Sequence, residues 1–146
     1  MILLAAASHI LWHASHTSAS LIARQEALES ARIAIDALTV SLQLSDKITL
    51  ETEQSGMLRR LTARQINPEG FDHAYVFYFN STLSPGALRY RRLDLGNQEL
   101  TSNIRAVYII LSADHKVINI TVISCDSLGE PIILTGAVNV QYKILN

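Results

Sequence analysis

The feature that most constrains the fold of this chain is a change in hydrophobic period near residue 45. Over residues 2–44 apolar side chains recur with the period of an α-helix, and after residue 46 they alternate with polar ones and β-branched residues dominate. A helix over 2–44 is about 65 Å long at ~1.5 Å per residue. Because a compact domain of 146 residues is narrower than that, we expect part of the helix to project.

The first half of the predicted helix differs in character from the second. Residues 1–23 are uncharged and mostly apolar, whereas the segment that starts at Arg24 is charged and amphipathic. Histidine, serine and threonine interrupt the opening, and a bilayer span needs about twenty mostly apolar residues. We therefore predict an α+β protein with an N-terminal hydrophobic helix over 1–23, a partial membrane or fibre segment, and a globular domain over 24–146.

Three rows of side chains follow the helix from residue 21 onward. The row expected to pack on the sheet is Leu21, Leu28, Ala31, Ile35, Leu38 and Leu42. The row expected to face solvent is Gln25, Glu29, Arg32, Asp36 and Gln43. A second apolar row, which one sheet on the first row cannot cover, consists of Ile22, Ile33, Val40 and Leu44. Because an exposed apolar stripe favours association, we expect this second row to be an assembly interface.

Seven strands are predicted after the helix: 47–52, 57–64, 74–79, 88–93, 105–112, 117–124 and 132–144. Turn residues separate them, and five of the six glycines lie in these breaks. Short connections predict an antiparallel meander, with 98–104 as a short helical turn or loop between two halves of the sheet. Gly136, inside the last strand, indicates a bulge or a close approach to the helix.

The composition favours no enzyme, cofactor or nucleic-acid partner. The net charge of −1 provides no extended basic surface, and alternation spreads Arg59-Arg60 and residues 89–92 over solvated strand faces. The single cysteine, Cys125, lies in an apolar run and is expected to pack as a small hydrophobic residue. No phosphate loop, nucleophile elbow or paired-cysteine motif is present.

The sequence contains one candidate metal site. His9, His13 and His16 are spaced by four and three residues, so they share one helix face and have the side chains that ligate zinc. No cysteine, aspartate or glutamate is near them in the sequence to complete a site. We therefore expect no stoichiometric metal.

At residues 31–42 the sequence resembles the helix of minor type IV pilins and of type II secretion minor pseudopilins, particularly the J-type group. The later segments 88–92, 100–107, 117–122 and 133–140 are similar in order and character to that group's sheet. The family's leader signal, a basic residue and glycine before Phe-Thr-Leu-Ile-Glu, has no counterpart, and we expect Met1 to fall inside the family's membrane helix.

The resemblance implies a pilin-like fold, a long N-terminal helix packed on an antiparallel sheet. It implies a non-enzymatic minor subunit of a type IV pilus or type II secretion pseudopilus, acting in fibre assembly or initiation. Its partners would be other pilin or pseudopilin subunits and the bacterial inner membrane, with the globular domain outside the cytoplasm. One alternative is a membrane-anchored or secreted β-domain that binds a ligand, with the helix as a plain anchor. A third is an enzyme with dispersed catalytic residues.

Overall fold

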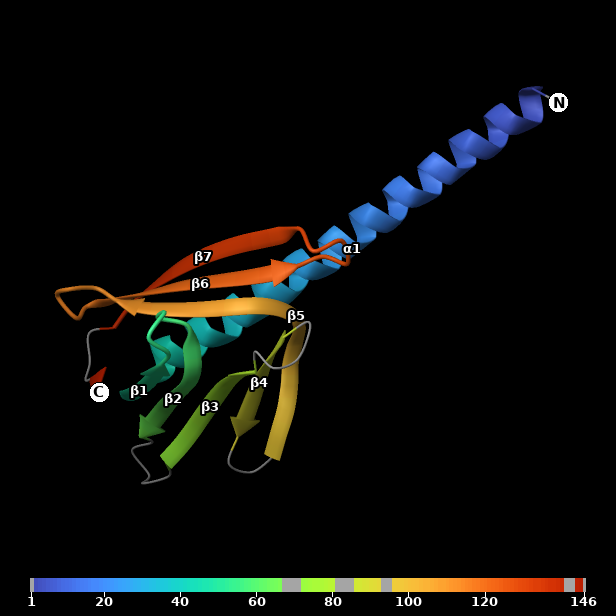
Figure 1. Ribbon diagram of the computed structural model, residues 1–146. Helices are drawn as coiled ribbons and strands as arrows, with labels where there is room; N and C mark the ends of the chain where they lie inside the picture. The colour runs from blue at the N-terminus through green and yellow to red at the C-terminus, as the bar shows by residue number, and fades with distance from the viewer. Residues whose placement is uncertain (1, 67–71, 81–85, 93–95, 141–143, 146) are drawn as a thin grey trace.

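The computed structural model describes residues 2–66, 72–80, 86–92, 96–140 and 144–145. One long helix, α1, precedes a curled sheet (Figure 1). The elements are α1 (Ile2–Leu44), β1 (Lys47–Thr52), β2 (Leu58–Ile66), β3 (Asp72–Asn80), β4 (Gly86–Arg92), β5 (Gly96–Leu111), β6 (Val117–Cys125), β7 (Pro131–Asn139) and β8 (Ile144–Leu145).

The helix α1 has the predicted bounds and runs for 43 residues without interruption. Its N-terminal half extends away from the sheet (Figure 1), and every side chain over residues 8–19 is exposed. From residue 8 onward, the first fully buried helix residue is Ala27. At the other end the Ser45 hydroxyl donates a hydrogen bond of 2.9 Å to the Leu42 carbonyl oxygen. This bond satisfies one of the carbonyl groups that a helix leaves unpaired at its C-terminus, so the helix ends where the serine competes for the backbone.

The strands β1 to β7 form the predicted antiparallel meander. Their order in the sheet is β7-β6-β5-β4-β3-β2-β1, and each strand pairs with the next strand in the chain. Together with α1 this confirms the α+β class. The short strand β8 adds a parallel neighbour at the outer edge of β1, with Ile48 opposite Ile144.

Two parts of the strand prediction were wrong. Residues 98–104 form neither a helical turn nor a loop but belong to β5, which is 16 residues long. This segment is polar and has weak intrinsic strand propensity, but β4 pairs with it and supplies its ladder partners. The last strand, predicted to reach residue 144, ends at Asn139, and Ile144 belongs to the separate strand β8. Residues 141–143 lie outside the described part of the chain.

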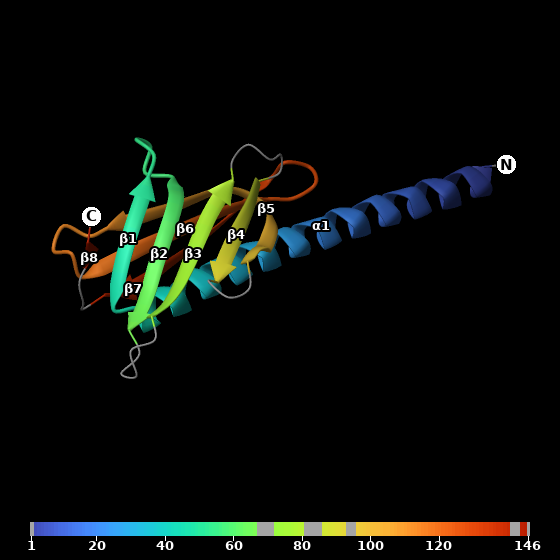
Figure 2. The same cartoon turned by 90° about the horizontal axis from the view of Figure 1, so that it is seen from below.

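The sheet curls around the C-terminal half of α1. Strands β5 to β7 lie on one side of the core and β1 to β4 on the other (Figures 1 and 2). The strand β5 bends between the two halves, with a register shift between Ile104 and Ala106, and an isolated bridge joins Met57 to Tyr108. Because only five residue steps separate Asn139 in β7 from Ile144 in β8, the two ends of the sheet lie within about 18 Å of each other.

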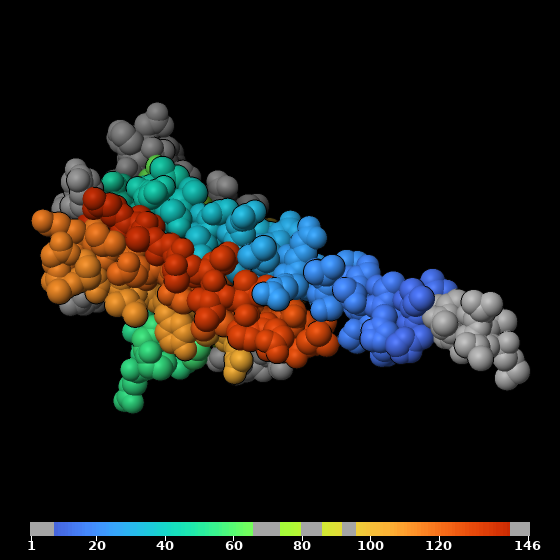
Figure 3. Space-filling view, turned by 90° about the horizontal axis from the view of Figure 1, so that it is seen from above, coloured from blue at the N-terminus to red at the C-terminus, as the bar shows by residue number. Residues whose placement is uncertain are grey.

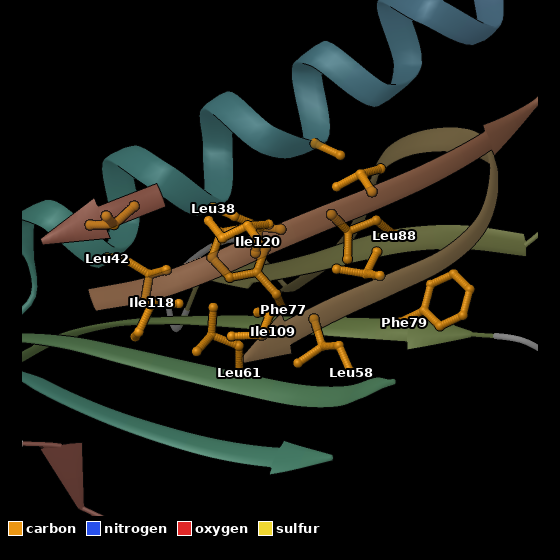
Figure 4. Packing of buried hydrophobic residues seen from close by; sticks show 14 of the residues in the cluster. Leu38, Leu42, Leu58, Leu61, Phe77, Phe79, Leu88, Ile109, Ile118 and Ile120 are labelled. Carbon is orange, nitrogen blue, oxygen red and sulfur yellow. The ribbon is translucent and has the colours of Figure 1, made fainter. Parts of the chain in front are cut away.

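The core fills the space between the helix and the two halves of the sheet. Leu38 and Leu42 of α1 point toward Phe77 of β3 and Ile118 of β6, and Leu61 of β2 closes the far side (Figure 4). All five are almost completely buried. The helix therefore completes a core that a single layer of strands cannot enclose.

The buried face of α1 was predicted only in part. Ala31, Leu38 and Leu42 are fully buried as predicted and Ile35 is partly buried, but Leu21 is 64% exposed and Leu28 is 38% exposed. Leu21 lies on the part of the helix that has already left the sheet. The positions closest to the strands are occupied by alanines, and the buried row is Ala27, Ala31, Ala34, Leu38 and Leu42.

The small residues in this row let the helix and the sheet approach closely. A Cβ atom at Gly136 would lie 3.5 Å from Cγ2 of Ile35 and 4.0 Å from Oγ1 of Thr39. The register between β6 and β7 continues unbroken through the pair of Ile120 with Gly136. Of the two predicted explanations for this glycine, close approach to the helix is therefore confirmed and a bulge is wrong.

Candidate functional site

The side of α1 that faces away from the sheet carries an apolar row. Ile22 is 56% exposed, Ile33 is 41%, Val40 is 51% and Leu44 is 54%. At 3.6 residues per turn the four fall within about 40° of arc, nearly opposite the buried alanines. The row extends for about 33 Å along the helix. Figure 3 shows that α1 is uncovered beside β7 over much of its length.

Acidic side chains lie among these apolar residues. Glu26, Glu29 and Asp36 are exposed and share the same side of the helix. Glu29 and Asp36, together with Arg32, belong to the polar row, and their predicted exposure is confirmed. With three carboxylates and the one guanidinium of Arg32, the exposed side of α1 is therefore apolar and carries a net negative charge. We refer to Ile22, Ile33, Val40 and Leu44 as the apolar row, and to Glu26, Glu29 and Asp36 as the acidic row.

The projecting half of α1 extends this surface toward the N-terminus. Ile10, Leu11 and Trp12 are 67%, 70% and 61% exposed. Leu11 lies eleven positions before Ile22, and eleven residues are close to three full helical turns, so it continues the apolar row. Across the residues described, no helix carries an apolar stretch of the length that crossing a membrane requires.

The three histidines form an aromatic cluster with Trp12. Ring centroids of His9 and His13 are 4.5 Å apart, those of Trp12 and His13 are 5.1 Å apart, and those of Trp12 and His16 are 5.5 Å apart. All four side chains are exposed. In the described part of the chain no three metal-ligating side chains converge on a position that could hold an ion. The histidine row is thus a solvent-facing edge of the helix.

A second surface, which sequence reasoning missed, lies on the outer face of β2 to β4. Arg60 pairs with Tyr78, and Tyr78 pairs with Arg89, so these three side chains form one row across the strands. The guanidinium carbon of Arg60 lies 5.4 Å from the centroid of the Tyr78 ring. A guanidinium nitrogen of Arg60 also lies 3.8 Å from Oε1 of Glu51. The Arg60 side chain therefore contacts both Tyr78 and Glu51 across the strands.

Alternation within one strand could not reveal this gathering of arginines. Arg91 follows Arg89 by two residues on β4, so it shares the same face, and both are exposed. The spacing of Arg89 and Arg91 therefore predicts that these two residues share a face of β4, but it does not predict which residues of β2 lie beside them. The cross-strand register that places Arg60 beside these residues depends on the pairing through β3. Cys125 is partly buried at the end of β6 and forms no disulfide.

No family model, curated protein or solved structure matches this chain.

Proposed function

We propose that this protein is a non-enzymatic minor subunit of a type IV pilus or a type II secretion pseudopilus, in which α1 packs against helices of neighbouring subunits. The observation that carries the proposal is the apolar row, which stays uncovered on α1 after the sheet has covered the opposite side of the helix. The resemblance at residues 31–42 supplies the class of fibre. It also supplies the proposed location, the bacterial inner membrane with the sheet domain outside the cytoplasm.

The energetics favour repeated contacts over a single pairing. Burying a fully exposed leucine, isoleucine or valine contributes about 1.5 to 3 kcal/mol, and the four residues of the apolar row are about half exposed. The row therefore contributes about 3 to 6 kcal/mol, close to the lower end of the ~4 to 15 kcal/mol that association costs. Ile10, Leu11 and Trp12 must add to it. In a fibre each subunit contacts several neighbours along its helix, so the apolar row and the group Ile10, Leu11 and Trp12 can be buried at the same time.

The test is to place one charge in the apolar row. Ile33→Glu puts an unpaired carboxylate into a helix bundle, which carries a large desolvation cost. In the organism that encodes the protein, we expect this variant to lose fibre incorporation or secretion. Circular dichroism and thermal unfolding should remain those of the wild type, because Ile33 does not belong to the core.

The matched control is Gln43→Glu, which adds the same charge at an exposed helix position outside the apolar row. It should assemble normally. Normal assembly of Ile33→Glu would reject the apolar row as an interface and favour the anchored, ligand-binding domain. Loss of assembly in both variants would show that α1 tolerates no added charge, and the apolar row would lose its special role.

A further inference from the structure

The outer face of the β1 to β4 half of the sheet is basic. Strand pairing places five cations on it, and among the described residues three acidic ones, Glu51, Asp72 and Glu99, share this face at register positions on β1, β3 and β5. The cations, which we refer to as the basic face, are Lys47, Arg60, Arg64, Arg89 and Arg91. Because Arg60 already contacts Glu51, the exposed pair Arg89 and Arg91 provides much of the charge that is open to a partner.

The basic face and the acidic row lie on opposite sides of the molecule. Inward-facing residues of the same strands, such as Leu61 and Phe77, share the core with Leu38 of α1. The outer face of those strands therefore points away from the helix. The acidic row lies on the side of α1 that points away from the sheet. The two charged surfaces cannot meet within one chain, but they can meet between two chains.

Their dimensions agree. Ten residues of helix separate Glu26 from Asp36, a distance of about 15 Å. On the sheet, two strand spacings of about 4.8 Å and two residues along β4 separate Arg60 from Arg91, a diagonal of about 12 Å. Tyr78, which is half-buried, adds apolar surface between the cations. Ile22 and Ile33 add apolar surface between the acids.

We propose that the basic face of one copy docks on the acidic row of α1 in a second copy. This proposal rests on the proposed function, in which helices of neighbouring subunits cover the apolar row, and it adds that the basic face contacts the acidic side chains beside that row. Because the two surfaces differ, the contact is heterologous. Each added copy leaves one basic face and one acidic row free at the ends of the assembly, so the contact can repeat from copy to copy. Charge pairing of this kind contributes orientation and partner choice, while burial of the apolar row contributes most of the affinity.

The experiment uses the full chain in a nonionic detergent and measures self-association by sedimentation velocity. One variant, Arg89→Glu with Arg91→Glu, makes both surfaces acidic. The other, Glu29→Arg with Asp36→Arg, makes both surfaces basic. We expect each variant alone to associate more weakly than the wild type by on the order of tenfold or more, because like charges then face each other. An equimolar mixture should regain association, since each surface again meets its opposite.

The control is Lys116→Glu, which reverses an exposed charge in the turn after β5, beyond the part of β5 that pairs with β4. It should associate as the wild type does. If a charge-reversed variant fails to fold, as judged by its thermal unfolding, the neutral pair Arg89→Gln and Arg91→Gln replaces it and should weaken association less strongly.

Two results would overturn the proposal. One is wild-type association of both reversed variants, and the other is a mixture that stays as weakly associated as its components. Loss of association on Ile33→Glu alongside either result would leave the helix interface standing and remove only the basic face as its partner. Binding of a polyanion such as heparin to the wild type, without self-association, would assign the basic face to a different ligand and would also reject the proposal.

Discussion

The hydroxyl of Ser124 on β6 donates a hydrogen bond of 2.7 Å to the backbone carbonyl oxygen of Ala27 on α1. Both residues are fully buried, and they are 97 positions apart in the sequence. The Ala27 carbonyl lies inside the helix, so the serine uses its second lone pair. This bond sets the position of α1 over β6 at the level where the helix first enters the core.

Removing this bond should cost a modest amount of stability. We expect Ser124→Ala to lower the free energy of unfolding by about 0.5 to 1.5 kcal/mol, because the Ala27 carbonyl keeps its helical partner and no buried group is left unpaired. Urea denaturation measures the change. Ser127→Ala, at an exposed turn position, serves as the control and should change stability by less than about 0.5 kcal/mol. Equal effects of the two substitutions would mean that the bond contributes nothing net.

The two sides of α1 should respond very differently to truncation. Leu38 is fully buried against the core, so Leu38→Ala should cost about 2 to 5 kcal/mol of unfolding free energy. Val40, two residues on, is half exposed, and Val40→Ala should cost less than about 0.5 kcal/mol. Denaturant unfolding of both variants tests this contrast. A large loss at Val40 would mean that this side of the helix is covered within the monomer.

The backbone at Gly136 should tolerate the addition of a Cβ atom but not of a larger side chain. A Cβ atom there would sit at 3.5 Å from Ile35, an ordinary van der Waals distance. We therefore expect Gly136→Ala to stabilise the protein by about 0.4 to 1 kcal/mol by restricting the unfolded chain. Gly136→Phe should destabilise it by about 1 to 3 kcal/mol, because the ring must displace α1 from β7. Thermal unfolding distinguishes the two, and a stable Phe variant would contradict the close approach.

The turn between β5 and β6 should show an acid-sensitive carboxylate. The Ser112 hydroxyl donates a hydrogen bond of 2.5 Å to Asp114, and the backbone N–H of Lys116 donates another of 3.2 Å. These bonds lower the pKa of Asp114, with the serine as the larger cause. Because the folded pKa lies below the unfolded one, the associated stability is present above the ordinary carboxylate pKa and is lost as pH falls through the lowered value.

An NMR titration of the Asp114 side chain measures this pKa directly. Ser112→Ala should raise it toward the ordinary aspartate value, whereas Ser55→Ala, at an exposed serine in another turn, should leave it unchanged. A wild-type pKa at the ordinary value would contradict the hydrogen-bonded turn.

The chain's local chemistry determined its elements and their order. The unbroken helical period over 2–44 predicted both ends of α1, and the turn residues predicted seven antiparallel strands in sequence order. Periodicity succeeds here because 3.6-residue and two-residue repeats each reflect burial on one side of a single element. For the same reason the apolar row Ile22, Ile33, Val40 and Leu44 was predicted as a second stripe, and the structure places all four on the exposed side of α1.

Relations between elements were decided only by tertiary structure. The position at which the curled sheet ends determines the helix residues that lie nearest the strands. Leu28 is therefore partly exposed, whereas Ala27 is buried. The polar segment 98–104 became a strand because β4 pairs with it. The arginines of β2 and β4 gather around Tyr78 through the register of three strands. A one-dimensional pattern reports the side of an element that is buried, whereas contacts across elements depend on register and curvature, which arise when the whole sheet closes on the helix.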